Sequence, residues 1–140
     1  MAYKIFLDTN IIIDYFIEDR PEHKNAVELF EKIIEEETYA YTAETVINTS
    51  AYLLAKYISN KKLKTVLDEM LHFVQILQSS NNTFHRAYLL ENNDLEDSVL
   101  YQIALENEID YFVTSDVGLS KKLYSKKLPV INAGNLLKKI

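Results

Sequence analysis

The sequence contains no cysteine, and only two glycines, two prolines and three histidines among its 140 residues. Without cysteine, a disulfide framework and a thiolate metal site are both excluded. Three histidines scattered along the chain do not suit a histidine-rich zinc site. Because glycine and proline are scarce, we expect most of the chain to lie in regular elements, mainly helices.

The bulk composition is that of an ordinary soluble globular protein, with 48% hydrophobic and 26% charged residues. The length predicts one domain over residues 1–140. A net charge of −6 argues against a nonspecific nucleic-acid coat, which needs a basic surface. The first apolar run carries Lys4 and Asp8 and is too short for a signal peptide or a membrane span. We therefore expect a cytoplasmic protein without membrane contact.

Short apolar runs alternate with segments of helical periodicity along the chain. Strands are expected at 3–7, 38–43, 73–77, 110–116 and 128–132. Helices are expected from about Asn10, from Ala26, over 44–57, from Ser59, over 84–92 and from Leu95. This alternation predicts an α/β fold in which helices cover both faces of a parallel sheet.

Acidic residues fall where two of the predicted strands end. Asp8 follows the first strand and Asp116 ends the fourth, while Asp94, Glu96 and Asp97 stand at the start of the helix before that fourth strand. Ligands of open parallel sheets gather at the carboxyl ends of the strands. We therefore expect these acids to converge at one edge of the sheet.

Two further polar residues start the helix that leaves the second strand. Glu44 and Asn48 are four residues apart and hence on one helix face. Their place at the same predicted edge makes them candidates to support the acids. Each also has a simpler interpretation, Glu44 as a solvated first-turn acid and Asn48 as a buried hydrogen-bonding group.

Converging carboxylates need a compensating charge. Two of them about 4 Å apart repel by about 4 kcal/mol at an effective dielectric constant near 20. They either raise one another's pKa or bind a hard cation, and oxygen-only ligands suit Mg²⁺ or Mn²⁺. Such a site activates water and stabilises the charge of a phosphodiester under attack. The pattern therefore favours a metal-dependent nuclease.

Each acid taken alone has a structural explanation. Asp8 and Asp116 have the residue type of helix N-caps, worth about 1 kcal/mol each. Asp94, Glu96 and Asp97 would stabilise the first turn of a helix through its macrodipole. The joint occurrence of these acids at one predicted edge favours the metal site.

Three segments resemble the PIN domain family, the nuclease fold of VapC-type toxins. They are "FLDTNIIIDYF" (6–16), "DLEDSVLYQIALENEIDYFVTSD" (94–116) and "LPVINAGNLL" (128–137). The segments match the family in order as well as in type, over nearly the whole chain. The resemblance implies a three-layer α/β/α sandwich with a central, mainly parallel sheet of about four to five strands.

The resemblance also implies roles for individual residues. Asp8, Asp97 and Asp116 correspond to the metal-binding and catalytic acids. The supporting positions are Asn10, Thr114 and Asp94, with Glu44 and Asn48 on the helix after the second strand. Many members of the family carry a glutamate where this chain has Asn48, and an amide cannot carry negative charge. This departure implies weaker metal binding and slower reaction.

The resulting hypothesis is an endoribonuclease that uses Mg²⁺ or Mn²⁺ to hydrolyse single-stranded or structured RNA. The resemblance implies a homodimer and the toxin of a toxin–antitoxin pair, neutralised by an antitoxin protein. One alternative is a PIN-fold module that binds RNA or protein with little or no cleavage. Another, a phosphatase or phosphoacceptor with Asp8 as nucleophile, is disfavoured because Asn10 stands where a haloacid-dehalogenase pattern has a second aspartate. Basic segments at 60–64 and 120–128 are expected to be solvated helix faces rather than RNA contacts.

Overall fold

The computed structural model describes residues 2–116, 118 and 127–140, and its described strands form one sheet. The strands are β1 (Tyr3–Leu7), β2 (Thr38–Ala43), β3 (Val74–Leu77), β4 (Tyr111–Val113) and β5 (Val130–Ile131). They lie in the order β3-β2-β1-β4-β5, and every neighbouring pair is parallel. The predicted parallel α/β sheet is therefore confirmed, with five strands.

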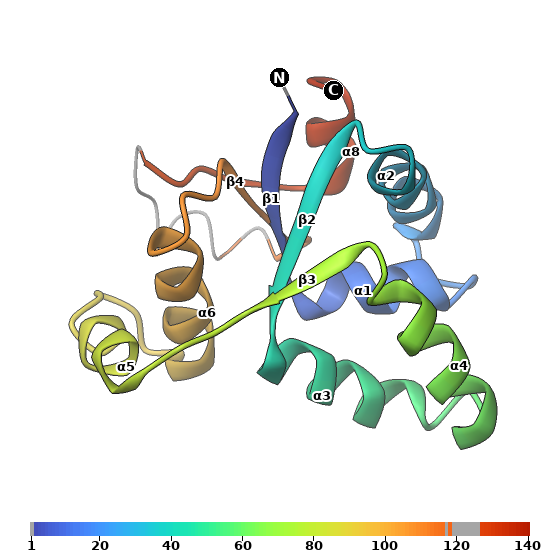
Figure 1. Cartoon of the computed structure of the whole chain (residues 1–140), viewed down its shortest axis with the longest axis horizontal. Coiled ribbons are helices and arrows are strands. Elements are labelled where there is room, and N and C mark those ends of the chain that lie inside the picture. Colours follow the sequence, from blue (N-terminus) through green and yellow to red (C-terminus); the bar gives the residue numbers. More distant parts are fainter. Residues whose placement is uncertain (1, 117, 119–126) are drawn as a thin grey trace.

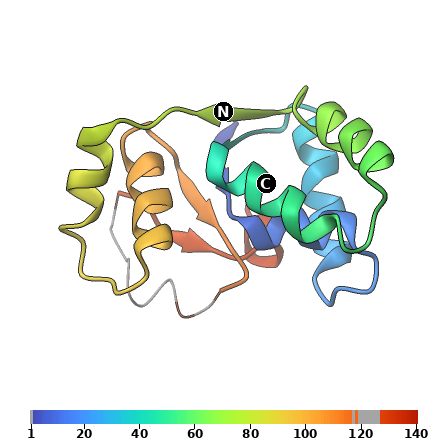
Figure 2. The ribbon, with the colours of Figure 1, turned by 90° about the horizontal axis from the view of Figure 1, so that it is seen from below.

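Helices cover both faces of this sheet (Figures 1 and 2). On one side lie α1 (Thr9–Phe16), α2 (His23–Ile34), α3 (Glu44–Leu54), α4 (Asn60–Met70) and α8 (Ala133–Leu137). On the other lie α5 (Asn81–Ala87) and α6 (Leu95–Leu105), coloured yellow to orange. The arrangement confirms the three-layer α/β/α sandwich.

The central strand β1 forms the middle of the core. Ile5, Phe6 and Leu7 have no exposed surface, because helices cover both of its faces, and this is why the strand is a continuous apolar run. The Phe6 ring stacks on the Phe112 ring of β4 with centroids 5.1 Å apart. Burial of these side chains fixes the ends of β1 and β4 relative to each other.

The helix α5 differs from its sequence prediction. A helix was expected over 84–92, after a polar break, but α5 begins at Asn81 and ends at Ala87. Ser80 caps the helix, and its backbone amide donates to the Thr83 hydroxyl at 3.2 Å in a capping box. The polar residues that were expected to break the chain therefore form the first turn.

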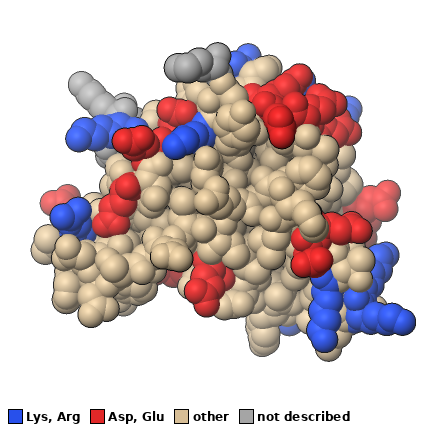
Figure 3. All heavy atoms as spheres, in the orientation of Figure 1, with Lys and Arg blue, Asp and Glu red and all other residues tan. Residues whose placement is uncertain are grey.

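Two further predictions concern segment ends and basic residues. The predicted strand at 110–116 is shorter, since β4 ends at Val113. Lys61, Lys62 and Lys64 are exposed on α4, and basic side chains gather over this helix in Figure 3. Most of the basic segment 120–128 lies outside the described residues. In the described part of the chain, no helix has the length and apolar character needed to cross a bilayer.

The carboxyl ends of β1 and β2 lie at the lower edge of the sheet in Figure 1. There β1 passes into α1 through Asp8 alone, and β2 passes directly into α3. The Asp8 amide donates to the Val113 carbonyl of β4 at 3.0 Å. The fold thus places the end of β1 beside the end of β4, which are more than a hundred residues apart in sequence.

Candidate metal centre at the carboxyl edge of the sheet

Asp8 is the most buried acid of this edge, with 7% of its surface exposed. It caps α1, and its Oδ1 accepts a hydrogen bond from the Thr9 amide at 2.8 Å. Its Oδ2 accepts from the Thr114 hydroxyl, also at 2.8 Å. The capping interpretation is therefore correct for Asp8, but the second hydrogen bond comes from Thr114 in the loop that follows β4.

Thr114 and Asn10 tie the loop after β4 to the start of α1. The Asn10 amide donates to the Thr114 hydroxyl at 2.9 Å, and its carbonyl oxygen accepts from the Ser115 amide at 3.0 Å. The Thr114 hydroxyl also accepts from the Asp116 amide at 3.1 Å. These bonds fix the backbone that carries Asp116 against the residue that carries Asp8.

The acids at the start of α6 face the same region. Asp94 caps the helix, and its Oδ1 accepts from the Asp97 amide at 3.0 Å. The pKa of the half-buried Asp97 is raised to about 7, first by burial and then by the charges of Asp94, Asp8, Asp116 and Glu96 in that order of importance. Asp97 therefore lies in the field of acids from β1, from α6 and from the loop after β4.

Asp8 and Glu96 experience the same negative field. Burial raises the pKa of Asp8, and Asp116 and Asp94 add to the rise, while hydrogen bonds from Thr114 and Thr9 oppose it. Burial also raises the pKa of Glu96, with contributions from Asp94 and Asp8. The effect is mutual, because each carboxylate makes ionisation of the others more costly.

The carboxylates are near enough to interact electrostatically, but they are not arranged as the ligands of one ion. Within residues 2–116, 118 and 127–140, no three acidic or histidine side chains form a group close enough to hold a metal ion. Asp116 is exposed, and its Oδ1 accepts from the Gly118 amide at 2.9 Å. The donors are nevertheless all oxygens with excess negative charge, which is the chemistry that Mg²⁺ and Mn²⁺ prefer. These residues therefore fit a hard divalent cation in their donor chemistry, but not in their spacing in this structure.

Glu44 and Asn48 lie beside the group of acids and are not part of it. Both are exposed on α3 and line a cavity of about 400 Å³ between α3, the end of β3, α5 and α6. Glu44 is not among the charges that shift the pKa of Asp8 or Asp97. The structure thus brings Asn10, Thr114 and Asp94 to the acids, and places Glu44 and Asn48 beside them.

The same cavity contains two residues for which no role was expected from the sequence. Gln78 and Phe84 line it together with Glu44 and Asn48. Gln78 belongs to a polar stretch that was expected to be a break, and Phe84 begins the helix that was expected over 84–92. Neither residue type nor spacing marked them in the sequence, because only the packing of four separate elements brings them together.

A family model described as PIN domain matches residues 4–118. "Ribonuclease VapC1" of Aquifex aeolicus is 28% identical over 133 residues, covering 91% of this chain and 89% of the relative.

Solved structures share the fold. A VapBC2 structure from Rickettsia felis superposes with a TM-score of 0.68 at 16% identity, covering 92% of this chain and 98% of that chain. The toxin VapC20 of Mycobacterium tuberculosis, titled as cleaving the sarcin–ricin loop, gives a TM-score of 0.69 at 13% identity, covering 87% of this chain and 97% of that one. The family match spans β1 to the loop after β4, and so includes every acid of the candidate centre. The chain belongs to the PIN domain family.

Proposed function

We propose that this protein is a metal-dependent endoribonuclease and the toxin of a toxin–antitoxin pair. One observation carries the proposal: in a PIN-domain chain, acids from separate segments lie near enough to Asp97, at the ligand-binding edge of the sheet, to help raise its pKa. The relative named as a ribonuclease supports RNA as the substrate. A bound cation would offset the repulsion between these acids.

In this proposal Asp8, Asp97 and Asp116 hold Mg²⁺ or Mn²⁺. A bound ion of this kind activates water and neutralises charge on the phosphodiester. Thr114 donates to Asp8 Oδ2 and so keeps Oδ1 and Oδ2 in a fixed orientation, while Asn10 holds the Thr114 hydroxyl in place. Asp97 must lose its carboxyl proton before it can act as a ligand, so the metal-free protein binds the ion more weakly below about pH 7.

Cleavage of RNA by purified protein tests the proposal. Short single-stranded RNA with Mn²⁺ should be cut by the wild-type protein, and Asp8→Asn should abolish cutting while retaining a residue that can cap α1. Asp19→Asn is the matched control, because Asp19 is exposed in the turn after α1 and lies outside the acidic centre. Equal cleavage by the wild-type and Asp8→Asn proteins would show that Asp8 does not hold a required metal.

The second candidate is a PIN-fold protein that binds RNA without cutting it. Asn48 favours this candidate, since it replaces by a neutral amide the acid that the family resemblance leads one to expect. Calorimetric titration with Mn²⁺ separates the two: heat of binding at millimolar or lower metal supports the nuclease, and its absence supports the binding protein. If Asn48 limits the reaction, Asn48→Glu should increase cleavage.

Protein partners are part of the same proposal. Large apolar side chains stand exposed near the candidate centre, including Leu89 with 83% and Leu95 with 61% of their surface. Surfaces of this kind favour protein contacts, here a second copy of the chain and an antitoxin that covers the acids. Light scattering should give the mass of a dimer for the protein alone, and a monomer would contradict this part of the proposal.

A further inference from the structure

The cavity beside the acidic centre has walls of different chemistry. Apolar residues that line it include Val99 and Ile103 of α6 and Phe84 of α5. Its polar lining residues are Glu44, Thr45, Asn48, Gln78 and Ser79. The volume of about 400 Å³ is within the range of small-ligand sites.

Helix α6 joins the cavity to the acids. Asp97 lies in the first turn of α6, and Leu100, which also lines the cavity, follows it by three residues. Residues three apart are neighbours on one face of an α-helix. A group held in the cavity therefore lies next to whatever the acidic centre holds.

The polar groups of the cavity suit a base better than a phosphate. Among the described residues that line it there is no lysine or arginine, so a phosphate would meet the Glu44 carboxylate with no positive charge from these residues. Asn48 and Gln78 can each donate and accept hydrogen bonds, as the edges of nucleobases require. A carboxylate such as that of Glu44 accepts from an exocyclic amino group, and an aromatic ring such as that of Phe84 stacks on a base.

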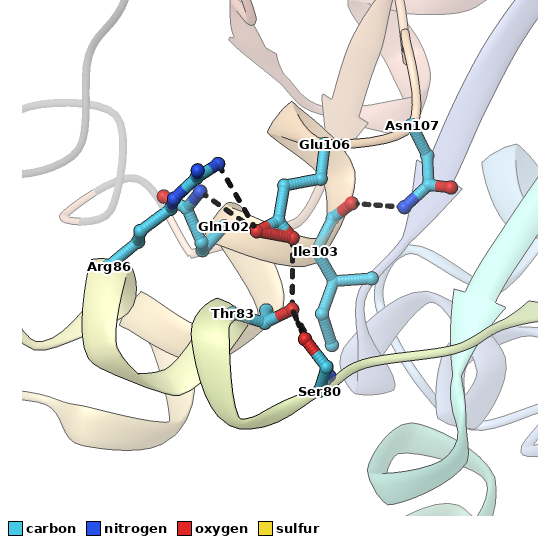
Figure 4. A network of polar contacts seen from close by, with 7 residues as sticks. All are labelled: Ser80, Thr83, Arg86, Gln102, Ile103, Glu106 and Asn107. Carbon is cyan, nitrogen blue, oxygen red and sulfur yellow. Dashed lines mark hydrogen bonds and ion pairs between the residues drawn. The ribbon is translucent and has the colours of Figure 1, made fainter.

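A polar network joins α5, which carries Phe84, to α6 (Figure 4). The buried Thr83 hydroxyl donates to Glu106 Oε2 at 2.9 Å, and Gln102 donates to Glu106 Oε1 at 3.4 Å. Arg86 lies 4.0 Å from the same carboxylate. Since Thr83 precedes Phe84 directly, this network fixes α5 on α6 and with it the backbone that carries Phe84 at the cavity. A preorganised backbone lowers the entropy lost when a base stacks on the ring.

We infer that this cavity binds one unstacked base of the RNA, next to the phosphodiester that is cut, and prefers a base with an exocyclic amino group. The inference rests on the proposed ribonuclease function, of which it specifies the substrate subsite. Phe84 stacks on the base, Glu44 accepts from its amino group, and Asn48 and Gln78 contact its edge. Adenine and cytosine fit this arrangement, and uracil has no exocyclic amino group to donate to Glu44.

Binding of fluorescent single-stranded RNA, measured by anisotropy, tests the subsite separately from cleavage. The Asp8→Asn protein is used throughout so that the RNA stays intact. In this background Phe84→Ala should weaken binding of oligo(A) about tenfold, in line with the loss of one stacked base. Phe84→Tyr, which retains the ring, should bind like the parent protein. Tyr57→Ala is the control, because Tyr57 is an aromatic residue with 72% exposure outside the cavity.

Two further comparisons make the test specific for bases. RNA with abasic nucleotides should bind equally to the parent and to Phe84→Ala, since no base is present to stack. Oligo(A) and oligo(C) should bind more tightly than oligo(U), and Glu44→Gln should reduce this difference.

If Phe84→Ala bound RNA as tightly as the parent protein, or lost as much affinity for abasic RNA as for oligo(A), the base subsite would be overturned. A segment of a protein partner would then be the occupant to test. Mn²⁺-dependent cleavage that is indifferent to Phe84 would overturn the subsite alone. Base binding that depends on Phe84 in a protein unable to cleave would support the subsite and contradict the nuclease.

Discussion

Replacement of Asp97 by asparagine should make the metal-free protein more stable above pH 7. Asp97 has a pKa raised from 3.8 to about 7 by burial and by its acidic neighbours. The folded protein therefore binds a proton at this position more tightly than the unfolded chain does. The free energy of unfolding therefore falls as the pH rises from about 4 to about 7, because Asp97 loses its proton less readily in the folded protein than in the unfolded chain. Above pH 7 Asp97 is charged in both states, and the folded protein is destabilised by the full amount.

The size of the effect follows from the shift. A rise of about 3 pH units corresponds to about 4 kcal/mol at 1.36 kcal/mol per unit. Asp97 is only partly buried, so solvent screening reduces this to about 1–2 kcal/mol. For a chain of this length, Asp97→Asn should raise the melting temperature by roughly 3–6 °C at pH 8 in EDTA. At pH 4 the gain should vanish.

Thermal unfolding followed by circular dichroism at both pH values measures this difference. Asp19→Asn serves as the control, and its melting temperature should change little. Addition of Mn²⁺ at pH 8 should stabilise the wild-type protein, since a ligand that binds only the folded state shifts the equilibrium toward it. The Asp97→Asn protein should show little of this Mn²⁺ stabilisation. If Asp97→Asn were less stable than wild type at pH 8, or if it were stabilised at pH 4 as much as at pH 8, the reasoning would be refuted.

Other predictions follow from single contacts. Thr114→Val removes the hydroxyl that donates to Asp8, and should lower the free energy of unfolding by about 1–2 kcal/mol and weaken Mn²⁺ binding. Thr38→Val is the control, because it removes a similar buried hydroxyl, which donates to the Tyr3 carbonyl at the other end of β1. It should leave the affinity for Mn²⁺ unchanged. Equal Mn²⁺ affinity in the Thr114→Val and Thr38→Val proteins would contradict the role of Thr114. Arg20→Leu should lower the free energy of unfolding by about 2–3 kcal/mol in urea, because Arg20 Nε donates at 2.8 Å to Oδ1 of the buried Asp14, whose Oδ2 has no hydrogen-bond partner among the described residues. A loss below about 0.5 kcal/mol would show that the ion pair contributes little.

The first two strands could be predicted because a buried strand has a recognisable amino-acid composition. Tyr3–Leu7 and Thr38–Ala43 match the expected ranges, since strands covered on both faces are continuous apolar or small-residue runs. Asn81–Ala87 was harder, because its helix begins with polar residues that satisfy the first-turn amides through a capping box. Local polarity alone does not distinguish such a turn from a loop.

The acids of the candidate centre were predictable from topology. A parallel sheet brings the ends of its strands to one edge, so Asp8 and Asp116 had to lie near each other. The hydrogen bond from Thr114 to Asp8 joins residues 106 apart in sequence, and its geometry depends on the pairing of β1 with β4. The cavity lined by Gln78 and Phe84 needed the packing of several elements. No pattern within a single segment contains that information.

The most direct test of the account is a crystal of the protein soaked in Mn²⁺, with anomalous diffraction measured at the manganese edge. We expect an anomalous peak at the carboxyl edge of the sheet, bounded by the carboxylates of Asp8, Asp97 and Asp116 and absent in Asp8→Asn crystals. An empty edge at millimolar Mn²⁺, or a peak held by other residues alone, would contradict the claim that these acids share a divalent cation.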